Sequence, residues 1–117
     1  MLVIYYEPNK LTVKGRLSMK VYQGDRTIDG ILVTVDGEML DERHDIKRFT
    51  NNGFEWTFEG DESRQLALAI LADHLGDDAR ALSLSEPFMT AVVANFDNTW
   101  EMSSDDVADA VSALEGG

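Results

Sequence analysis

The sequence predicts an α+β fold, in which an antiparallel sheet of four to five strands carries three or four helices packed on one face. Residues 17–59 are mainly alternating or β-branched apolar segments separated by turn signals, whereas residues 61–115 are mainly segments with helical spacing. The 117 residues suffice for one domain with a buried core, and they contain no evident linker or repeat. We therefore predict a single domain over residues 1–117, with residues 1–16 as an added N-terminal strand or hairpin.

The first predicted strands are apolar runs that end at turn residues. Residues 2–6 form one β-prone run, and residues 11–23 alternate between apolar and polar side chains until Gly24-Asp25, where we expect the strand to end. Residues 31–35 form the next strand, and Asp36-Gly37 predicts a hairpin turn after it.

A further strand is predicted over residues 53–59, where polar and aromatic residues alternate. This alternation would place Phe54, Trp56 and Phe58 on one face of the sheet. We expect that face to pack against a buried helix over residues 64–75, which is apolar almost all round and stops at Gly76.

The rest of the chain predicts two further helices and a short extended segment. Asp77-Asp78 would start a short helical segment through Leu84, and Ser85 would cap a separate helix with Pro87 in its first turn. Residues 99–102 are expected to be extended. Ser103 or Ser104 would cap a last helix with an apolar stripe at Val107, Ala110, Val111 and Leu114.

Charge limits the classes of partner. The chain has a formal net charge of −12, and residues 59–117 hold 13 acids but only Arg64 and Arg80 as bases. Because such a surface repels phosphates, we expect no direct nucleic-acid binding and no membrane binding. Abundant Asp with little Lys favours a salt-rich cytoplasm, as in a haloarchaeon or its virus or plasmid. An ordinary acidic mesophilic protein and a surface for a basic partner remain the alternatives.

Few residues can support catalysis. The chain has no Cys and two His, and it lacks the glycine-rich, GxSxG and HExxH motifs. We therefore expect no cofactor and favour a non-enzymatic protein. The cluster Asp41-Glu42-Arg43-His44-Asp45 could hold a divalent metal, but we favour a solvated loop in which Arg43 and Lys47 partner the acids.

Two groups of candidate residues follow from these patterns. Glu55 lies between aromatic residues and is predicted to pair with Arg43, Arg48 or Arg64, the alternative being a desolvated functional carboxylate. The candidate motif residues are Arg43, Asp45, Glu55 and Trp56. The candidate interaction surface is acidic and consists of Asp77, Asp78, Asp105, Asp106 and Asp109.

The block GFEWTFEGDESRQLALAILADHLGDD resembles the signature of an uncharacterised domain-of-unknown-function family of small bacterial, phage and archaeal proteins. The family pattern has GFEWGY, then GSGP, then a QLALAIL helix, and it is preceded by a VTVDG hairpin. The resemblance covers residues 20–114 and implies a fold unit without an activity. Where the family has GSGP this chain has Gly60-Asp61-Glu62-Ser63, which makes anion binding by that loop less expected.

We predict a cytoplasmic accessory or protein-interaction module, acting in its own cell, in an infected host cell or in a virion. The alternatives are an acidic mimic of nucleic acid that inhibits a basic host protein, and a small metal-dependent hydrolase that uses Asp41, Asp45 and Glu55. Residues 2–6 are too apolar for a free edge strand, so we also predict that they contact a partner or a second copy of the chain, the alternative being an inner strand of the same sheet.

Overall fold

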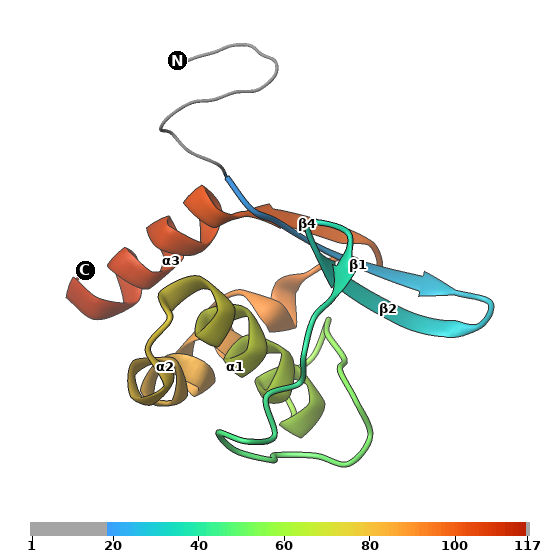
Figure 1. Ribbon diagram of the computed structural model, residues 1–117, viewed down its shortest axis with the longest axis horizontal. Coiled ribbons are helices and arrows are strands. Elements are labelled where there is room, and N and C mark those ends of the chain that lie inside the picture. Colours follow the sequence, from blue (N-terminus) through green and yellow to red (C-terminus); the bar gives the residue numbers. More distant parts are fainter. Residues whose placement is uncertain (1–18, 117) are drawn as a thin grey trace, which may run out of the picture.

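The computed structural model describes residues 19–116 (Figure 1). The chain forms β1 (Val21–Thr27), β2 (Gly30–Val35), β3 (Glu38–Met39), α1 (Asp61–Leu75), α2 (Asp78–Ala91), the 3-10 turn η1 (Val93–Asn95), β4 (Trp100–Ser103) and α3 (Ser104–Gly116). The predicted α+β class is confirmed, because the strands form one antiparallel sheet and the helices lie on one side of it. Residues 1–16, predicted as an added strand or hairpin, lie outside the described residues.

The sheet has the strand order β3-β2-β1-β4, so β4 joins it from the far end of the chain. All three pairings are antiparallel. The predicted hairpin turn at Asp36-Gly37 is present, with positive φ angles of 51° and 83° that suit these two residue types. The β1–β2 hairpin extends beyond the helices in Figure 1.

The predicted end of the first strand at Gly24-Asp25 is wrong, because β1 continues to Thr27. Gly24 is paired directly with Trp100 of β4. A Cβ atom on Gly24 would lie 2.1 Å from Trp100 Nε1, so the indole occupies the space that any other side chain would need. The glycine therefore serves close packing within a strand and does not mark a turn.

The predicted strand over residues 53–59 is also wrong, because this segment forms no strand and the fourth strand is β4. Trp56 is fully buried as expected, but Phe58 is 47% exposed. Thr57 has a φ of 81°, which turns the chain and ends the alternation of faces. The segment covers the core mainly through Trp56, with the half-buried Phe54 packed beside the core.

The central helix α1 agrees with its prediction. Its buried stretch runs through residues 65–72, and Gly76 ends it with a left-handed φ of 64°. Gln65 is fully buried within this helix and holds the loop over residues 41–52. Its amide donates to the carbonyls of Glu42 and Lys47 and accepts from the amide of Phe49, at 2.6, 3.0 and 2.8 Å.

The two helices predicted over residues 77–96 are instead one helix, α2, which starts at the expected cap Asp77 and continues through Pro87. Pro87 leaves the carbonyl of Ser83 without a helical donor, but Ser83 is exposed and water can satisfy that carbonyl. Ser85 is buried and does not cap a helix, because its hydroxyl donates to the Leu82 carbonyl and accepts from Arg64.

The last helix begins as predicted. The amide of Asp106 donates to the Ser103 hydroxyl at 3.1 Å, and the amide of Ser103 donates to the Asp106 carboxylate at 3.0 Å. This reciprocal pair is a capping box, and it satisfies two amides at the start of α3. Val107 and Val111 of the predicted stripe are buried against the core.

The conformation of Thr57 leads to a stability prediction. A β-branched residue with a φ of 81° is strained, and glycine has no such strain. We expect Thr57→Gly to raise the free energy of unfolding by about 1 kcal/mol, measured by urea denaturation. The control Thr90→Gly, in the last turns of α2, should instead lower it. A loss of stability in Thr57→Gly would contradict this account.

Candidate functional site

The sheet has one face against the helices and a second face that no described element covers. Along β1 the side chains alternate, with Tyr22 buried and Gln23 and Asp25 exposed. The helices lie on the Tyr22 side. We call the second face the outer face and define it by the residues Gln23, Asp25, Leu32, Thr34, Met39, Thr99 and Glu101.

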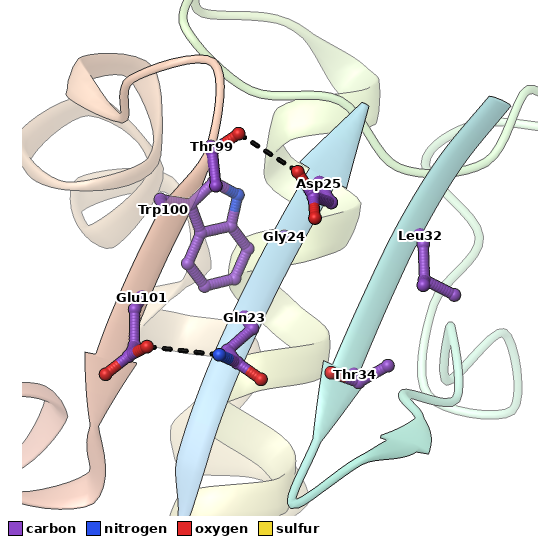
Figure 2. A pocket seen from close by; sticks show the side chains of 8 residues that line it. All are labelled: Gln23, Gly24, Asp25, Leu32, Thr34, Thr99, Trp100 and Glu101. Atoms are coloured by element: carbon purple, nitrogen blue, oxygen red, sulfur yellow. Dashed lines mark hydrogen bonds between the residues drawn. The ribbon is translucent and has the colours of Figure 1, made fainter. Parts of the chain in front are cut away.

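The outer face contains a shallow hollow of about 280 Å³, lined by residues of β1, β2 and β4 and by Thr99. Figure 2 shows two hydrogen bonds across it. The Thr99 hydroxyl donates to Asp25 at 3.0 Å, and the Gln23 amide donates to Glu101 at 3.1 Å. Both carboxylates are exposed, so the hollow has an acidic rim held in place by neutral donors.

The outer face also exposes apolar side chains. Leu32 is 41% exposed beside the hollow, and Met39, paired with Thr34, is 68% exposed. Ile28, at the tip of the β1–β2 hairpin, is fully exposed. Acidic and apolar groups together are suited to a partner surface with basic and apolar side chains.

Beneath the outer face, an aromatic cluster supports the strands. The Trp100 ring stacks on Phe96 with centroids 4.2 Å apart and meets Trp56 edge-on at 5.9 Å. The Arg26 guanidinium lies 4.5 Å from the centre of the Trp56 ring and 2.8 Å from the Glu55 carboxylate. Glu55 therefore forms an ion pair, but with Arg26 of β1 and not with the predicted Arg43, Arg48 or Arg64.

Arg43 links the loop to α2. Its guanidinium donates to both carboxylate oxygens of Asp45, at 3.0 and 3.1 Å, and it also reaches Asp78 at 3.3 Å. Arg43 holds the pKa of Asp45 below its ordinary value, mainly through these hydrogen bonds. Arg43 thus pairs with a loop acid as expected and anchors the loop to α2. The expected ion pair of Lys47 is not present among the described residues.

The structure does not bring the acids of the hydrolase alternative together. Asp45 is bound to Arg43 and Glu55 to Arg26, while Asp41 accepts a hydrogen bond from the Arg43 amide at 2.6 Å. Within residues 19–116, no group of three or more His, Asp or Glu side chains is placed to hold a metal ion.

The five residues of the predicted acidic surface lie on two helices and have different roles. Asp77 caps α2 by accepting from the Arg80 amide at 3.1 Å, and Asp78 pairs with Arg43. Asp106 belongs to the capping box of α3. Asp105 and Asp109 are exposed on α3. Three of the five acids are thus engaged within the molecule.

A partly buried polar cluster joins the start of β1 to α1. The Tyr22 hydroxyl donates to Asp73 at 2.7 Å, and the Lys20 ammonium lies 3.1 Å from the same carboxylate oxygen. Burial and the Asp73 carboxylate raise the pKa of Tyr22 above its ordinary value. Burial, with Lys20, lowers the pKa of the neighbouring His74.

The lowered pKa of His74 predicts a pH dependence. Above pH 6.5, the ordinary pKa of His, the side chain is neutral in the folded and unfolded states. Below it, the unfolded state binds the proton first, so stability falls until the pH passes the lower folded pKa. We expect His74→Asn to reduce the loss of stability between pH 7 and pH 5, measured by urea denaturation at several pH values. An unchanged slope would contradict this assignment.

The outer-face residues were not among the candidates from sequence. Alternation along β1 and β2 could have placed Gln23, Asp25, Leu32 and Thr34 on one side of the sheet. The position of Thr99 and Glu101 beside them depends on the β1–β4 pairing, which joins residues almost 80 positions apart in sequence, such as Gln23 and Glu101. Local patterns carry no signal for that pairing.

The fold and the site together define a small α+β domain in which residues 19–116 leave one face of the sheet uncovered. The chain belongs to a family of unknown function (DUF6166), whose sequence model matches residues 22–113. The predicted membership of a domain-of-unknown-function family is confirmed. Comparisons with curated proteins and with solved structures found no match to this chain. No helix within the described part of the chain is both long enough and apolar enough to cross a membrane.

Proposed function

We propose that this protein is a non-enzymatic interaction module that binds a partner protein through the outer face of its sheet. The observation that carries the proposal is the exposure of Leu32 and Met39 next to the acidic hollow. Exposed apolar side chains beside charged ones are typical of protein-binding surfaces.

The partner is expected to present basic side chains together with apolar ones. Asp25 and Glu101 border the hollow, and the whole chain has a net charge of −12, so positive charge on the partner would speed association and favour this orientation. The geometry supports this partner better than an acidic mimic of nucleic acid, because Asp77, Asp78 and Asp106 are engaged in caps and an ion pair.

The test compares the outer face with a matched control surface. Three tagged proteins would be incubated with extract of the native cell at its native salt concentration. They are the wild type, the sheet variant Leu32→Lys/Met39→Lys, and the α3 control Ser112→Lys/Ala113→Lys. Both variants add the same charge at exposed or partly exposed positions, on the sheet and on α3 respectively. Bound proteins would be quantified by mass spectrometry.

We expect one partner to be retained by the wild type and the α3 control and to be reduced at least about tenfold by the sheet variant. Binding of the purified partner to Asp25→Asn should then be weaker and less salt-dependent than binding to the wild type. Equal retention by all three proteins would overturn the proposal.

The proposed salt-rich host cytoplasm, that of a haloarchaeon or its virus or plasmid, leads to a separate prediction. Molar KCl should raise the melting temperature, because screening removes the repulsion within a chain of net charge −12. Asp105→Asn with Asp109→Asn should reduce this response, since both residues are exposed and lie one helical turn apart. Differential scanning calorimetry would measure it. A melting temperature that is independent of salt would favour an ordinary acidic mesophilic protein.

A further inference from the structure

The outer face is acidic at the hollow and apolar beside it. It lies next to the start of β1, where the described residues begin. Met19 is 54% exposed and directly precedes β1. Lys20 continues the pairing with the end of β4, because its carbonyl accepts from the Ser104 amide at 2.9 Å. Whatever precedes Met19 is therefore tethered beside the outer face.

The sequence before Met19 complements this face in charge. Residues 1–18 contain Lys10, Lys14 and Arg16 but only one acid, Glu7, and so have a net charge of +2. The chain as a whole has a net charge of −12, which leaves −14 for the remaining residues. The segment therefore has the opposite charge to the acidic hollow.

The same segment also complements the face in apolar character. Residues 2–6 are Leu-Val-Ile-Tyr-Tyr. Leu11, Val13 and Leu17 add further apolar residues before Met19. The segment therefore contains apolar side chains of the kind that Leu32 and Met39 expose on the outer face.

We propose that residues 1–18 of the same molecule dock on the outer face, with residues 2–6 against Leu32 and Met39. The reach is sufficient, since 12 intervening residues span up to about 40 Å and four strands are about 20 Å wide. Tethering also gives the segment an effective concentration on the order of millimolar at the face. A second copy of the sheet is a poorer occupant, because it would place Asp25 and Glu101 against like charges.

If the segment docks on the outer face, a partner would have to displace it before binding there. This regulatory role rests on the proposed function. The docking itself needs no partner and can be tested on the purified chain. The absence of Cys from the sequence allows specific cross-linking. Tyr5→Cys would be combined with Thr34→Cys on the outer face or, as the control, with Ser112→Cys on the exposed side of α3.

A short bismaleimide would be added to each double variant, and products would be followed by gel mobility and peptide mapping. We expect intramolecular cross-linking to Thr34→Cys at least about tenfold faster than to Ser112→Cys, although Ser112 is the more exposed position. Reversing the charge of Lys10, Lys14 and Arg16 by substitution with Glu should lower that rate at low salt towards the control rate.

Equal cross-linking rates in the two double-cysteine variants would overturn the inference. A product that is mainly a covalent dimer would also overturn it, because the segment would then dock on a second copy of the chain. Neither result bears on partner capture, which is tested with Leu32→Lys and Met39→Lys in the full chain. Equal capture of the partner by the wild type and the sheet variant, with faster cross-linking to Thr34→Cys, would show that only the proposed function has failed. Selective loss of capture by the sheet variant, with equal cross-linking rates, would show that only the docking inference has failed.

Discussion

Trp56→Ala is expected to lower the free energy of unfolding by about 3–5 kcal/mol, the usual cost of removing a large buried aromatic side chain. Trp56 is fully buried, donates from its indole to the Asn98 carbonyl at 3.1 Å, and packs edge-on against Trp100. The substitution also removes the ring beneath the Arg26 guanidinium. Urea denaturation followed by circular dichroism would measure the effect.

The matched control for this prediction is Phe58→Ala. Phe58 is another aromatic residue of the same segment, but it is 47% exposed. Its loss should cost less than half as much, since the cost scales with the apolar area that folding buries. Equal costs for the two variants would mean that the segment contributes to the core as a unit and that Trp56 has no special role.

Gly24→Val is expected to lower the free energy of unfolding by about 3 kcal/mol, the upper part of the range for overpacking. A Cβ atom on Gly24 would lie 2.1, 2.4 and 2.7 Å from three atoms of the Trp100 indole. The indole has little room to move, because it stacks on Phe96 and contacts Trp56. The strain would fall on the β1–β4 pairing.

A double-mutant cycle separates the clash from the general cost of changing a glycine. In a Trp100→Leu background, Gly24→Ala should cost about 2 kcal/mol less than it does in the wild type, because the smaller side chain leaves room for the methyl group. Additive costs would show that backbone effects, and not the indole, make glycine necessary at this position.

The features that sequence predicted well are those that neighbouring residues determine. Each of these features depends on residues that are close in sequence, and the structure has all of them. They are the apolar run of α1, its end at Gly76, the Asp36-Gly37 turn and the Ser103 cap. The pairing of β4 with β1 depends on distant residues, so sequence indicated an extended segment at residues 99–102 without a place in the sheet.

The wrong strand over residues 53–59 has a different cause. Alternating aromatic residues indicate a strand only if the backbone stays extended, and the left-handed φ of 81° at Thr57 breaks that condition. Threonine rarely adopts such a φ, so the residue type at this position gives no signal of the turn. By contrast, Gln65 in an apolar helix was a sign of a buried polar contact, now seen in its bonds to the loop.

The late position of β4 also has a consequence for folding during synthesis. β1 is among the first described residues to leave the ribosome, but one of its two neighbours, Trp100–Ser103, follows only after α1 and α2. Until then the edge of β1 at Gly24 is unpaired and the aromatic cluster lacks Trp100. Nascent chains shorter than about 100 residues would therefore expose a strand edge that is prone to pair with other chains, and the tunnel must release β4 before the native sheet can close.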